Sequence, residues 1–310
     1  MMRSFFLYLA RATWAKSFIM RLGIARRTAL RFIAGESLAE GIEATRALNA
    51  RGLEATLDHL GESVYNEAGA RQATQDYLEL LNAIAESGVK ATVSLKLTQL
   101  GLDVSEELCL ENMRAILDCA RLQGNHATID MESSDYTDRT LALYRKLRDE
   151  EGFKCVGIVI QSYLYRSQAD MQALAAEGAY VRLCKGAYKE PPDRAFPDKS
   201  DVDANYVRLV EEFLTPEARA AGAYLCIATH DEKMISAAQA HVKAHDVPYD
   251  SFEFQMLYGI RGKLQQELHD DGYHVRVYVP YGTQWYPYYM RRLAERPANV
   301  WFLMSNFFRR

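Results

Sequence analysis

The sequence has few cysteines and prolines and no long uncharged apolar run. Its 310 residues include five scattered cysteines, none of them in a Cys-x-x-Cys motif. This odd, scattered set argues against a disulfide framework and a zinc site and indicates reduced thiols. Eight prolines and 18 glycines exclude a collagen-like chain. Because no uncharged apolar stretch reaches about 18 residues, we expect no membrane-spanning helix.

The sequence also lacks an excess of one charge. It has 37 Lys+Arg against 41 Asp+Glu, a formal net charge of −4, and 49% hydrophobic residues. This balance gives no support to a nucleic-acid partner, and the apolar fraction excludes a disordered chain. His241 and His245 are four residues apart, but no His-Glu-x-x-His motif accompanies them. We therefore expect these histidines on the surface and no metal site.

The first 31 residues are basic, with seven Lys or Arg and no acid. Arg11 and Lys16 interrupt the apolar stretch, which argues against a signal peptide. We expect residues 1–50 to form a helical region that docks on the body through side chains such as Phe5 and Trp14. A targeting leader and a peripheral contact with anionic lipid are the alternatives. The expected location is the cytoplasm, or the inner face of the cell membrane if the lipid contact forms.

Eight short apolar runs follow, each succeeded by a stretch with helical spacing. The runs cover residues 55–58, 91–96, 127–130, 156–161, 180–183, 225–229, 252–256 and 275–279. The helical stretches cover 74–85, 106–121, 137–150, 168–177, 202–213, 232–245, 259–270 and 286–296. The runs are mostly spaced by roughly 20 to 35 residues, the size of a βα unit.

This alternation predicts the α/β class: a (β/α)8, TIM-like barrel at residues 51–310, preceded by extra N-terminal helices at residues 1–50. A doubly wound sheet is the alternative. However, the first βα turn lacks the Gly-x-Gly-x-x-Gly fingerprint that would bind a dinucleotide there.

Polar residues accumulate at or just after the ends of the apolar runs. They are Asp58, Glu62, Lys96, Asp130, Gln161, Arg182, Lys185, Thr229, His230, Gln255 and Tyr278. Any one of them is most simply a salt bridge at the rim. Buried polar groups need partners, however, and active sites of barrels lie at the carboxyl ends of the strands. The accumulation therefore predicts a ligand site at this rim, and the long, proline-rich loop over residues 185–197 lies beside it.

A second group of functional candidates lies on the last helical stretch. Arg291 follows Tyr288 by three residues, and Glu295 follows Arg292 by three, so each pair is adjacent on a helix surface. Two neighbouring guanidiniums can clamp one carboxylate, because each presents a planar, permanently charged donor fork. A solvated basic helix end is the alternative.

In their order along the chain, these motifs resemble the proline dehydrogenase family, and within it the short, monofunctional bacterial members. The segments that carry the resemblance are 93–97, 129–132, 161–165, 182–188, 228–231, 252–259, 277–282 and 288–295. The resemblance implies oxidation of L-proline to Δ1-pyrroline-5-carboxylate, the first step of proline catabolism. It implies non-covalently bound FAD, a membrane quinone as electron acceptor, and a separate pyrroline-5-carboxylate dehydrogenase downstream, because the chain has no room for that second domain.

The resemblance also implies a role for each matching residue. Arg291 and Arg292 would hold the proline carboxylate, and hydride would pass to the flavin N5 beside the catalytic residues Asp130 and Arg182. Glu62 would be a gate that pairs with Arg291. The substrate-binding set is Lys96, Leu257, Tyr278, Tyr288, Arg291 and Arg292. The cofactor-binding set is Met131, Gln161, Arg182, Lys185, Gly186, Ala187, Tyr188, Thr229, His230 and Glu295.

One position departs from the family pattern. Larger relatives carry Trp after the Lys-Gly-Ala-Tyr motif, whereas this chain carries Lys189. This difference bears on the aromatic contact to one end of FAD, not on the chemistry that the resemblance implies.

Three other functions stay open on the sequence alone. A flavin barrel of the folate-reductase type would share the architecture but use a nicotinamide donor. An aldolase would form a Schiff base on Lys96 or Lys185. A non-catalytic barrel would bind a membrane through its basic first 31 residues.

Overall fold

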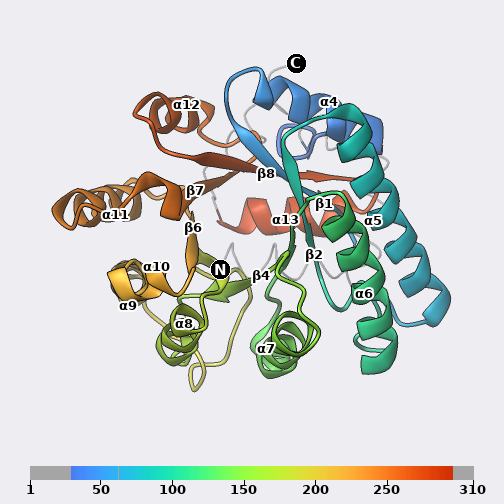
Figure 1. Cartoon of the computed structure of the whole chain (residues 1–310), viewed down its shortest axis with the longest axis horizontal. Coiled ribbons are helices and arrows are strands. Elements are labelled where there is room, and N and C mark those ends of the chain that lie inside the picture. The colour runs from blue at the N-terminus through green and yellow to red at the C-terminus, as the bar shows by residue number, and fades with distance from the viewer. Residues whose placement is uncertain (1–28, 62, 296–310) are drawn as a thin grey trace, which may run out of the picture.

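Eight segments rich in β-branched and apolar residues form parallel strands, and the strands close into a barrel in the order β1 to β8 (Figure 1). The computed structural model describes residues 29–61 and 63–295, with side chains up to Leu293. The strands are β1 (Glu54–His59), β2 (Ala91–Leu95), β3 (Ala127–Ile129), β4 (Val156–Gln161), β5 (Tyr180–Cys184), β6 (Tyr224–Ala228), β7 (Phe252–Leu257) and β8 (Val275–Tyr281). Each strand overlaps its predicted run, so the predicted barrel is confirmed.

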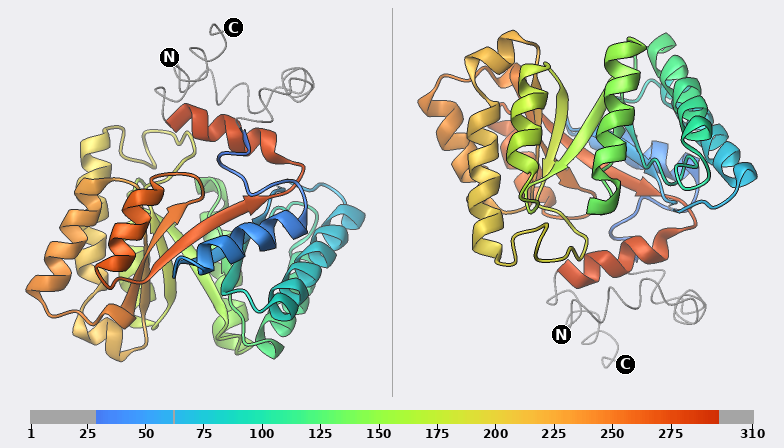
Figure 2. Two further views of the ribbon diagram at one scale, coloured as in Figure 1. Left: turned by 90° about the horizontal axis from the view of Figure 1, so that it is seen from above. Right: turned by 90° about the horizontal axis from the view of Figure 1, so that it is seen from below.

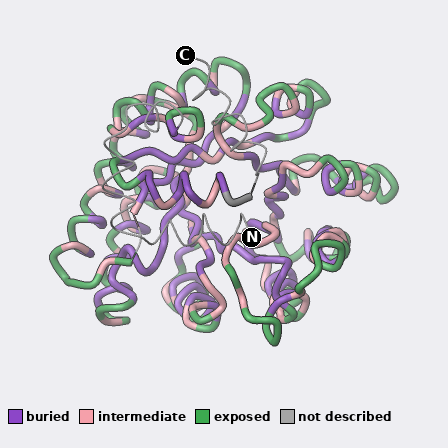
Figure 3. Tube along the Cα trace, turned by 180° about the vertical axis from the view of Figure 1, so that it is seen from behind, coloured by how far each residue is buried: buried purple, intermediate pink, exposed green. Residues whose placement is uncertain are grey.

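The barrel closes between its first and last strands. Glu54 lies opposite Arg276 in the register, and His59 lies opposite Tyr281. The strands are buried on both faces, because their inward side chains, several of them polar, fill the barrel and their outward side chains pack under the helices. Figure 3 shows this distribution: burial follows the strands and the inner sides of the helices, and exposed residues lie on the outside.

Helices α4 to α13 surround the barrel or cross its end. Their bounds are α4 (Leu38–Asn49), α5 (Glu67–Ser87), α6 (Glu106–Leu122), α7 (Thr137–Arg145), α8 (Ser167–Ala176), α9 (Lys199–Phe213), α10 (Pro216–Ala220), α11 (Glu232–Ala244), α12 (Gly262–Asp270) and α13 (Trp285–Glu295). Short 3-10 turns lie at Ser134–Tyr136 and Tyr249–Ser251. Within the described residues, no helix combines the length and apolarity needed to cross a membrane.

Local sequence signals explain where the helices begin and end. Asn66 caps α5 by accepting a hydrogen bond from the amide of Gly69, a contact worth about 1 kcal/mol, and α5 ends at Gly88 in the left-handed conformation. The predicted helix over 137–150 changes its winding: α7 ends at Arg145 and a π-helical turn continues through Lys146–Glu150. The short helix α10 was not predicted, although Thr215 caps it and Pro216 begins it.

The segment that precedes α4 ties the barrel to its last helix. The amide of Ala34 donates to the carbonyl of Pro280 at 2.8 Å, and Trp285 Nε1 donates to Glu36 at 3.0 Å. Ala29 and Ile33 pack in one apolar cluster with the buried side of α13. These contacts hold α13 across one end of the barrel (Figure 2). Of the predicted N-terminal helical region, α4 is present, whereas residues 1–28, with Phe5 and Trp14, lie outside the described residues.

Candidate active site

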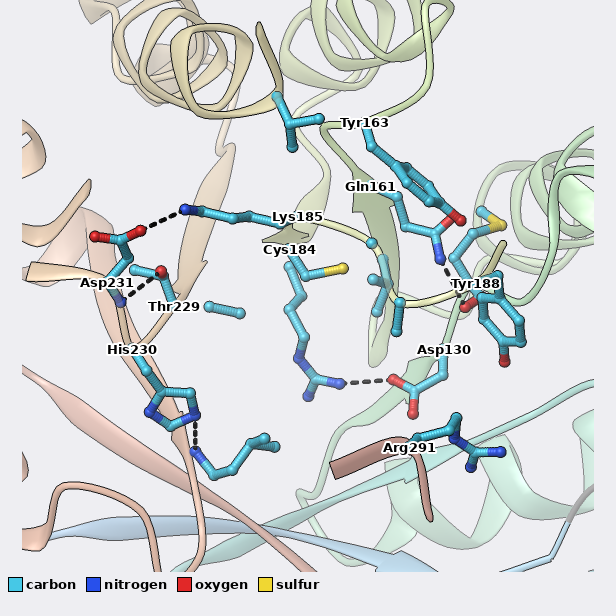
Figure 4. Close-up of a pocket in the computed structure, with 18 of the residues that line it drawn as sticks. Asp130, Gln161, Tyr163, Cys184, Lys185, Tyr188, Thr229, His230, Asp231 and Arg291 are labelled. Carbon is cyan, nitrogen blue, oxygen red and sulfur yellow. Dashed lines mark hydrogen bonds and ion pairs between the residues drawn. The ribbon is translucent and has the colours of Figure 1, made fainter. Parts of the chain in front are cut away.

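One cavity of about 960 Å³ opens at the carboxyl ends of the strands (Figure 4). Every predicted site residue whose side chain the structure describes lines this cavity. Those residues are Lys96, Asp130, Met131, Gln161, Arg182, Lys185, Gly186, Ala187, Tyr188, Thr229, His230, Leu257, Tyr278, Tyr288, Arg291 and Arg292. Glu62 and the side chain of Glu295 lie outside the described residues, so their predicted roles stay predictions.

Asp130 joins side chains from several strands at the cavity floor. Its Oδ1 accepts from Arg182 Nη1 at 2.7 Å and from Ser94 Oγ at 2.9 Å. Its Oδ2 accepts from the Tyr278 hydroxyl at 2.7 Å. Burial, followed by the charge of Asp130, raises the pKa of Tyr278 well above its usual value. Tyr278 therefore stays protonated and donates, and Asp130 stays bound to three donors.

Arg182 is held from two directions. Its Nη1 donates to Asp130 and Ser94, and its Nε donates to Gln255 Oε1 at 2.5 Å. Its Cζ lies 5.3 Å from the centroid of the Tyr278 ring, a cation–π distance. Burial opposes the charge of Arg182, but Asp130 and other neighbours hold its pKa above the ordinary value. The guanidinium is therefore a fixed positive charge in the cavity wall.

Two buried polar atoms in the cavity wall have no hydrogen-bond partner among the described residues. They are Arg182 Nη2, a donor, and Gln161 Oε1, an acceptor. The amide nitrogen of Gln161 is already engaged by the carbonyl of Met131 at 3.4 Å. Buried polar atoms are rarely left unpaired, because each costs about 1–3 kcal/mol when it loses its partner. A ligand with both a donor and an acceptor would satisfy them.

Lys96 lies between two carboxylates beside Asp130. Its Nζ is 3.5 Å from Asp58 Oδ1 and 3.7 Å from Asp130 Oδ2. Burial raises the pKa of Asp58, and Lys96 opposes that shift. Asp58 is 1% exposed and Lys96 is 8% exposed, so both are removed from bulk water.

Lys185 is committed to a pair of aspartates on the opposite wall. Its Nζ contacts Asp203 Oδ1 at 2.5 Å and Asp231 Oδ2 at 2.7 Å, and Figure 4 shows it pointing towards Asp231. Burial by itself would raise the pKa of Asp231, but Lys185 lowers it to about 2. Lys185 also lowers the pKa of Asp203, so both carboxylates are ionised at neutral pH and engage the Lys185 ammonium from two sides. A lysine whose Nζ is held between two aspartates is poorly placed to attack a carbonyl, which disfavours a Schiff base at this position.

The loop after β5 passes close to the neighbouring strand. Gly186 has φ +107°, and a Cβ there would lie 2.5 Å from the ring of Tyr163, so only glycine fits. Further along, Glu190 accepts from the amide of Ser134 at 2.9 Å and from the Tyr163 hydroxyl at 3.1 Å. Glu190 also bonds the hydroxyl of Ser134. We call these contacts the Glu190 latch; they hold the loop that carries Gly186, Ala187 and Tyr188.

Other contacts orient side chains near the mouth of the cavity. The amide of Leu257 donates to His230 Nε2 at 3.1 Å, and Thr229 accepts from the amide of Asp231 at 3.1 Å. On α13, the Arg292 Cζ lies 5.2 Å from the centroid of the Tyr288 ring. Arg291, labelled in Figure 4, lines the same cavity.

The sequence patterns did not identify the residues that neutralise or orient the predicted site residues. Asp203 lies on α9, far along the chain from Lys185, and Ser94 lies inside β2. Asp58 and Gln255 were recognised as polar strand ends but were given no role. A weak signal was present for Ser94, because it precedes Lys96 by two residues and alternate residues of a strand point the same way.

Comparison with known proteins gives a consistent result. The family model described as proline dehydrogenase matches residues 41–305. The chain is 42% identical over 309 residues to proline dehydrogenase 1 of Bacillus subtilis (strain 168), an alignment that covers 98% of each protein. It is 44% identical over 278 residues to proline dehydrogenase of Deinococcus radiodurans, which covers 89% of this chain and 88% of that protein.

The fold is also similar to part of a larger solved structure. That structure is proline utilization A (PutA) from Bdellovibrio bacteriovorus inactivated by N-propargylglycine, with a TM-score of 0.82 and 26% identity. The match covers 95% of this chain but 35% of that one. Three findings indicate the same family: the shared barrel fold, the family match over 265 residues, and the two bacterial relatives aligned over most of their length. This chain therefore belongs to the proline dehydrogenase family and is an enzyme of proline oxidation.

Proposed function

We propose that the enzyme uses non-covalently bound FAD to oxidise L-proline to Δ1-pyrroline-5-carboxylate and passes the electrons to a membrane quinone. The observation that carries the cofactor is the pair of unpartnered buried atoms, Arg182 Nη2 and Gln161 Oε1, in the cavity wall. The polar edge of an isoalloxazine ring offers both acceptors and an N–H donor. It therefore suits a wall that presents one donor and one acceptor.

Other features of the cavity also suit FAD. Its volume of about 960 Å³ lies at the upper end of the range of about 300–1,000 Å³ that is usual for ligand sites. Gly186 lines the cavity without a side chain, so its main-chain atoms face the space that a ligand would fill, and the Glu190 latch holds that loop. Met131, Gln161, Arg182, Lys185, Gly186, Ala187, Tyr188, Thr229 and His230 are the residues that would hold the cofactor; Glu295 is proposed on resemblance.

We assign the substrate to the part of the cavity between α13 and the strand ends. Arg291 and Arg292 would hold the carboxylate, with the Lys96 ammonium nearby. Arg292 is braced by the ring of Tyr288, which limits the freedom it must lose on binding. Leu257 and the Tyr278 ring would pack against the apolar ring carbons of proline.

Bound FAD supplies an acceptor for the hydride that leaves the proline Cδ, and the side chains of the enzyme set the pose and the charge around that step. The carboxylate clamp orients the proline ring. Asp130 holds Arg182 and Tyr278 in place, so that Arg182 places a positive charge where negative charge develops on reduction. Lys185 is less suited to that role, because Asp203 and Asp231 already neutralise it.

The quinone acceptor and a peripheral membrane contact are proposals that follow from family membership. Of the seven basic residues in the segment that would contact anionic lipid, six lie within residues 1–28, outside the described residues. Sedimentation of the full chain with anionic and with neutral vesicles tests the membrane contact, because binding to the anionic vesicles alone is expected.

The cofactor and substrate are tested together by an anaerobic titration of the purified protein. We expect a yellow protein whose flavin absorption bleaches on addition of L-proline and recovers on addition of a soluble quinone. Bleaching by a nicotinamide but not by proline would favour the folate-reductase type. A colourless protein that cannot be reconstituted with FAD, and in which borohydride traps an adduct on Lys96, would favour the aldolase.

A further inference from the structure

A chain of buried polar side chains runs through the barrel interior from its amino end to Arg182. Arg276 Nε donates to Glu253 Oε1 at 2.7 Å, and Gln255 Nε2 donates to the same oxygen at 2.5 Å. The Tyr180 hydroxyl also donates to it, at 3.2 Å. Gln255 Oε1 then accepts from Arg182 Nε at 2.5 Å. Glu253 is 2% exposed, Gln255 3% and Arg182 5%, so water does not compete for these bonds.

The orientation of the Gln255 amide is dictated by this arrangement. An ionised carboxylate only accepts hydrogen bonds, so the NH2 group of Gln255 must face Glu253. Its oxygen then faces Arg182, whose guanidinium only donates. Burial would raise the pKa of Glu253, but Arg276 lowers it, and the carboxylate therefore stays charged. The ion pair at the amino end of the barrel thus fixes which end of the amide reaches the active site.

Gln255 in turn fixes the plane of a catalytic group. The Nη1 of Arg182 is held by Asp130 and Ser94, and its Nε is held by Gln255 from β7. Because hydrogen bonds hold the planar guanidinium at two different nitrogens, it cannot rotate about either contact. Its third nitrogen, Nη2, therefore keeps a single direction. With Nε released, the guanidinium could turn about the Nη1 contacts.

We propose that Gln255 is a positioning residue that aims Arg182 at the bound cofactor, and that the Glu253–Arg276 ion pair orients Gln255. This inference rests on the proposed function, in which Arg182 faces the flavin. Gln255 acts through Arg182, so its loss should change the midpoint potential of the flavin more than the KM for proline.

The test compares substitutions at Gln255 with one at a distant buried amide. Gln255→Met removes both hydrogen bonds at similar volume. Gln255→Asn keeps an amide, but its side chain is too short to reach both partners. This variant tests the positioning role if the Met variant does not fold. Gln255→Glu is the conservative variant: beside Glu253 it would hold a proton, so it can still donate to Glu253 and accept from Arg182. Asn112→Leu is the control, since Asn112 is 3% exposed, bonds the carbonyl of Leu100 and lies outside the cavity.

We expect Gln255→Met and Gln255→Asn to bind FAD with a more negative midpoint potential and a kcat lowered roughly 10- to 100-fold, as for one lost hydrogen bond to a charged group. The KM for proline should stay near that of the wild type. Gln255→Glu should recover most of the kcat and the potential, and Asn112→Leu should lower only the free energy of unfolding.

Two outcomes separate this inference from the function on which it rests. If the wild type is reduced by proline but the Met and Asn variants keep its potential and kcat, the positioning role is wrong and the proposed function stands. If the Met and Asn variants lose only stability, by as much as Asn112→Leu does, the positioning role is likewise wrong and the proposed function stands. If the wild-type protein neither binds FAD nor oxidises proline, the proposed function itself fails.

Discussion

At the scale of single residues, the positive charges on the cavity floor and wall are held by carboxylates, and α13 adds two further arginines to the cavity lining. Arg182, Lys96 and Lys185 each contact at least one carboxylate within the cavity wall. Arg291 and Arg292 line the cavity from α13, the helix that lies across one end of the barrel (Figure 2). This placement suits residues that bind a substrate anion rather than maintain the fold.

We predict that Arg291→Met and Arg292→Met each raise the KM for proline about 30-fold to several thousand-fold, since removing one partner of a buried charge pair costs roughly 2–5 kcal/mol. Steady-state kinetics at saturating FAD measure the effect. Arg261→Met is the matched control, because Arg261 also lines the cavity, pairs with Glu232 and is given no role in binding the substrate. An unchanged KM in both α13 variants would remove the carboxylate clamp.

His126 provides a prediction about stability. Its Nε2 is buried without a partner among the described residues, and burial lowers its pKa from 6.5 to about 3. Below pH 6.5 the unfolded chain binds a proton that the folded chain does not, so stability falls as pH decreases from about 6.5 towards 3. The slope from this residue is up to about 1.4 kcal/mol per pH unit.

Denaturant unfolding of the wild type and of His126→Phe at several pH values checks this expectation. The variant keeps a ring against Tyr180, whose centroid lies 4.3 Å from that of His126, and its stability should depend less on pH over the same window. Identical pH dependence in the two proteins would show that His126 is not the group that titrates.

At the scale of elements, the loop after β5 is held in part by side chains from two neighbouring loops. The Glu190 latch connects it to the 3-10 turn after β3 and to Tyr163 after β4. Main-chain hydrogen bonds from Tyr163 to Lys185 and from Phe196 to Tyr163 hold the two ends of the loop, and the latch holds the part between them. The latch therefore preorganises the backbone around Gly186.

We predict that Glu190→Gln weakens FAD binding by roughly tenfold, the effect of losing charge-assisted hydrogen bonds, while the KM for proline at saturating FAD stays near the wild-type value. Fluorescence titration of the apoenzyme with FAD measures the affinity. Glu111→Gln, which breaks an exposed pair with Arg71, should leave it unchanged. Equal FAD affinity in both variants would mean that the latch does not shape the site.

How far the sequence could predict these elements depends on the range of the interactions. The strands were predictable because each is a short apolar run followed by a helical pattern, and the polar strand ends because a barrel brings them to one rim. The partners of those residues were not, because Asp203 reaches Lys185 from α9 and the Glu190 latch joins separate loops. The π-helical turn at Lys146–Glu150 left no clear pattern in the sequence.

For the whole enzyme, the ionisation of the substrate should control the pH dependence of turnover. The secondary amine of proline must be neutral before hydride leaves, and at neutral pH the ammonium form dominates. Among the described residues that line the cavity, Asp58 is a carboxylic acid with a raised pKa. It is buried beside Lys96, so we assign the pH dependence to the substrate and not to this acid. We therefore predict that kcat/KM rises with pH through neutrality. Anaerobic stopped-flow reduction of the flavin across this range tests the prediction, and a flat profile would contradict it.

The pairing of β1 with β8 has a consequence for synthesis of the chain. The pairing of β1 with β8 runs from Glu54 opposite Arg276 to His59 opposite Tyr281. It cannot form in a nascent chain until the last strand has left the ribosome. Until then, β1 and β7 present unpaired backbone edges that can recruit other chains. Premature termination before residue 275 should therefore yield insoluble fragments, and chaperones that shield sheet edges should matter most during the final stage of translation.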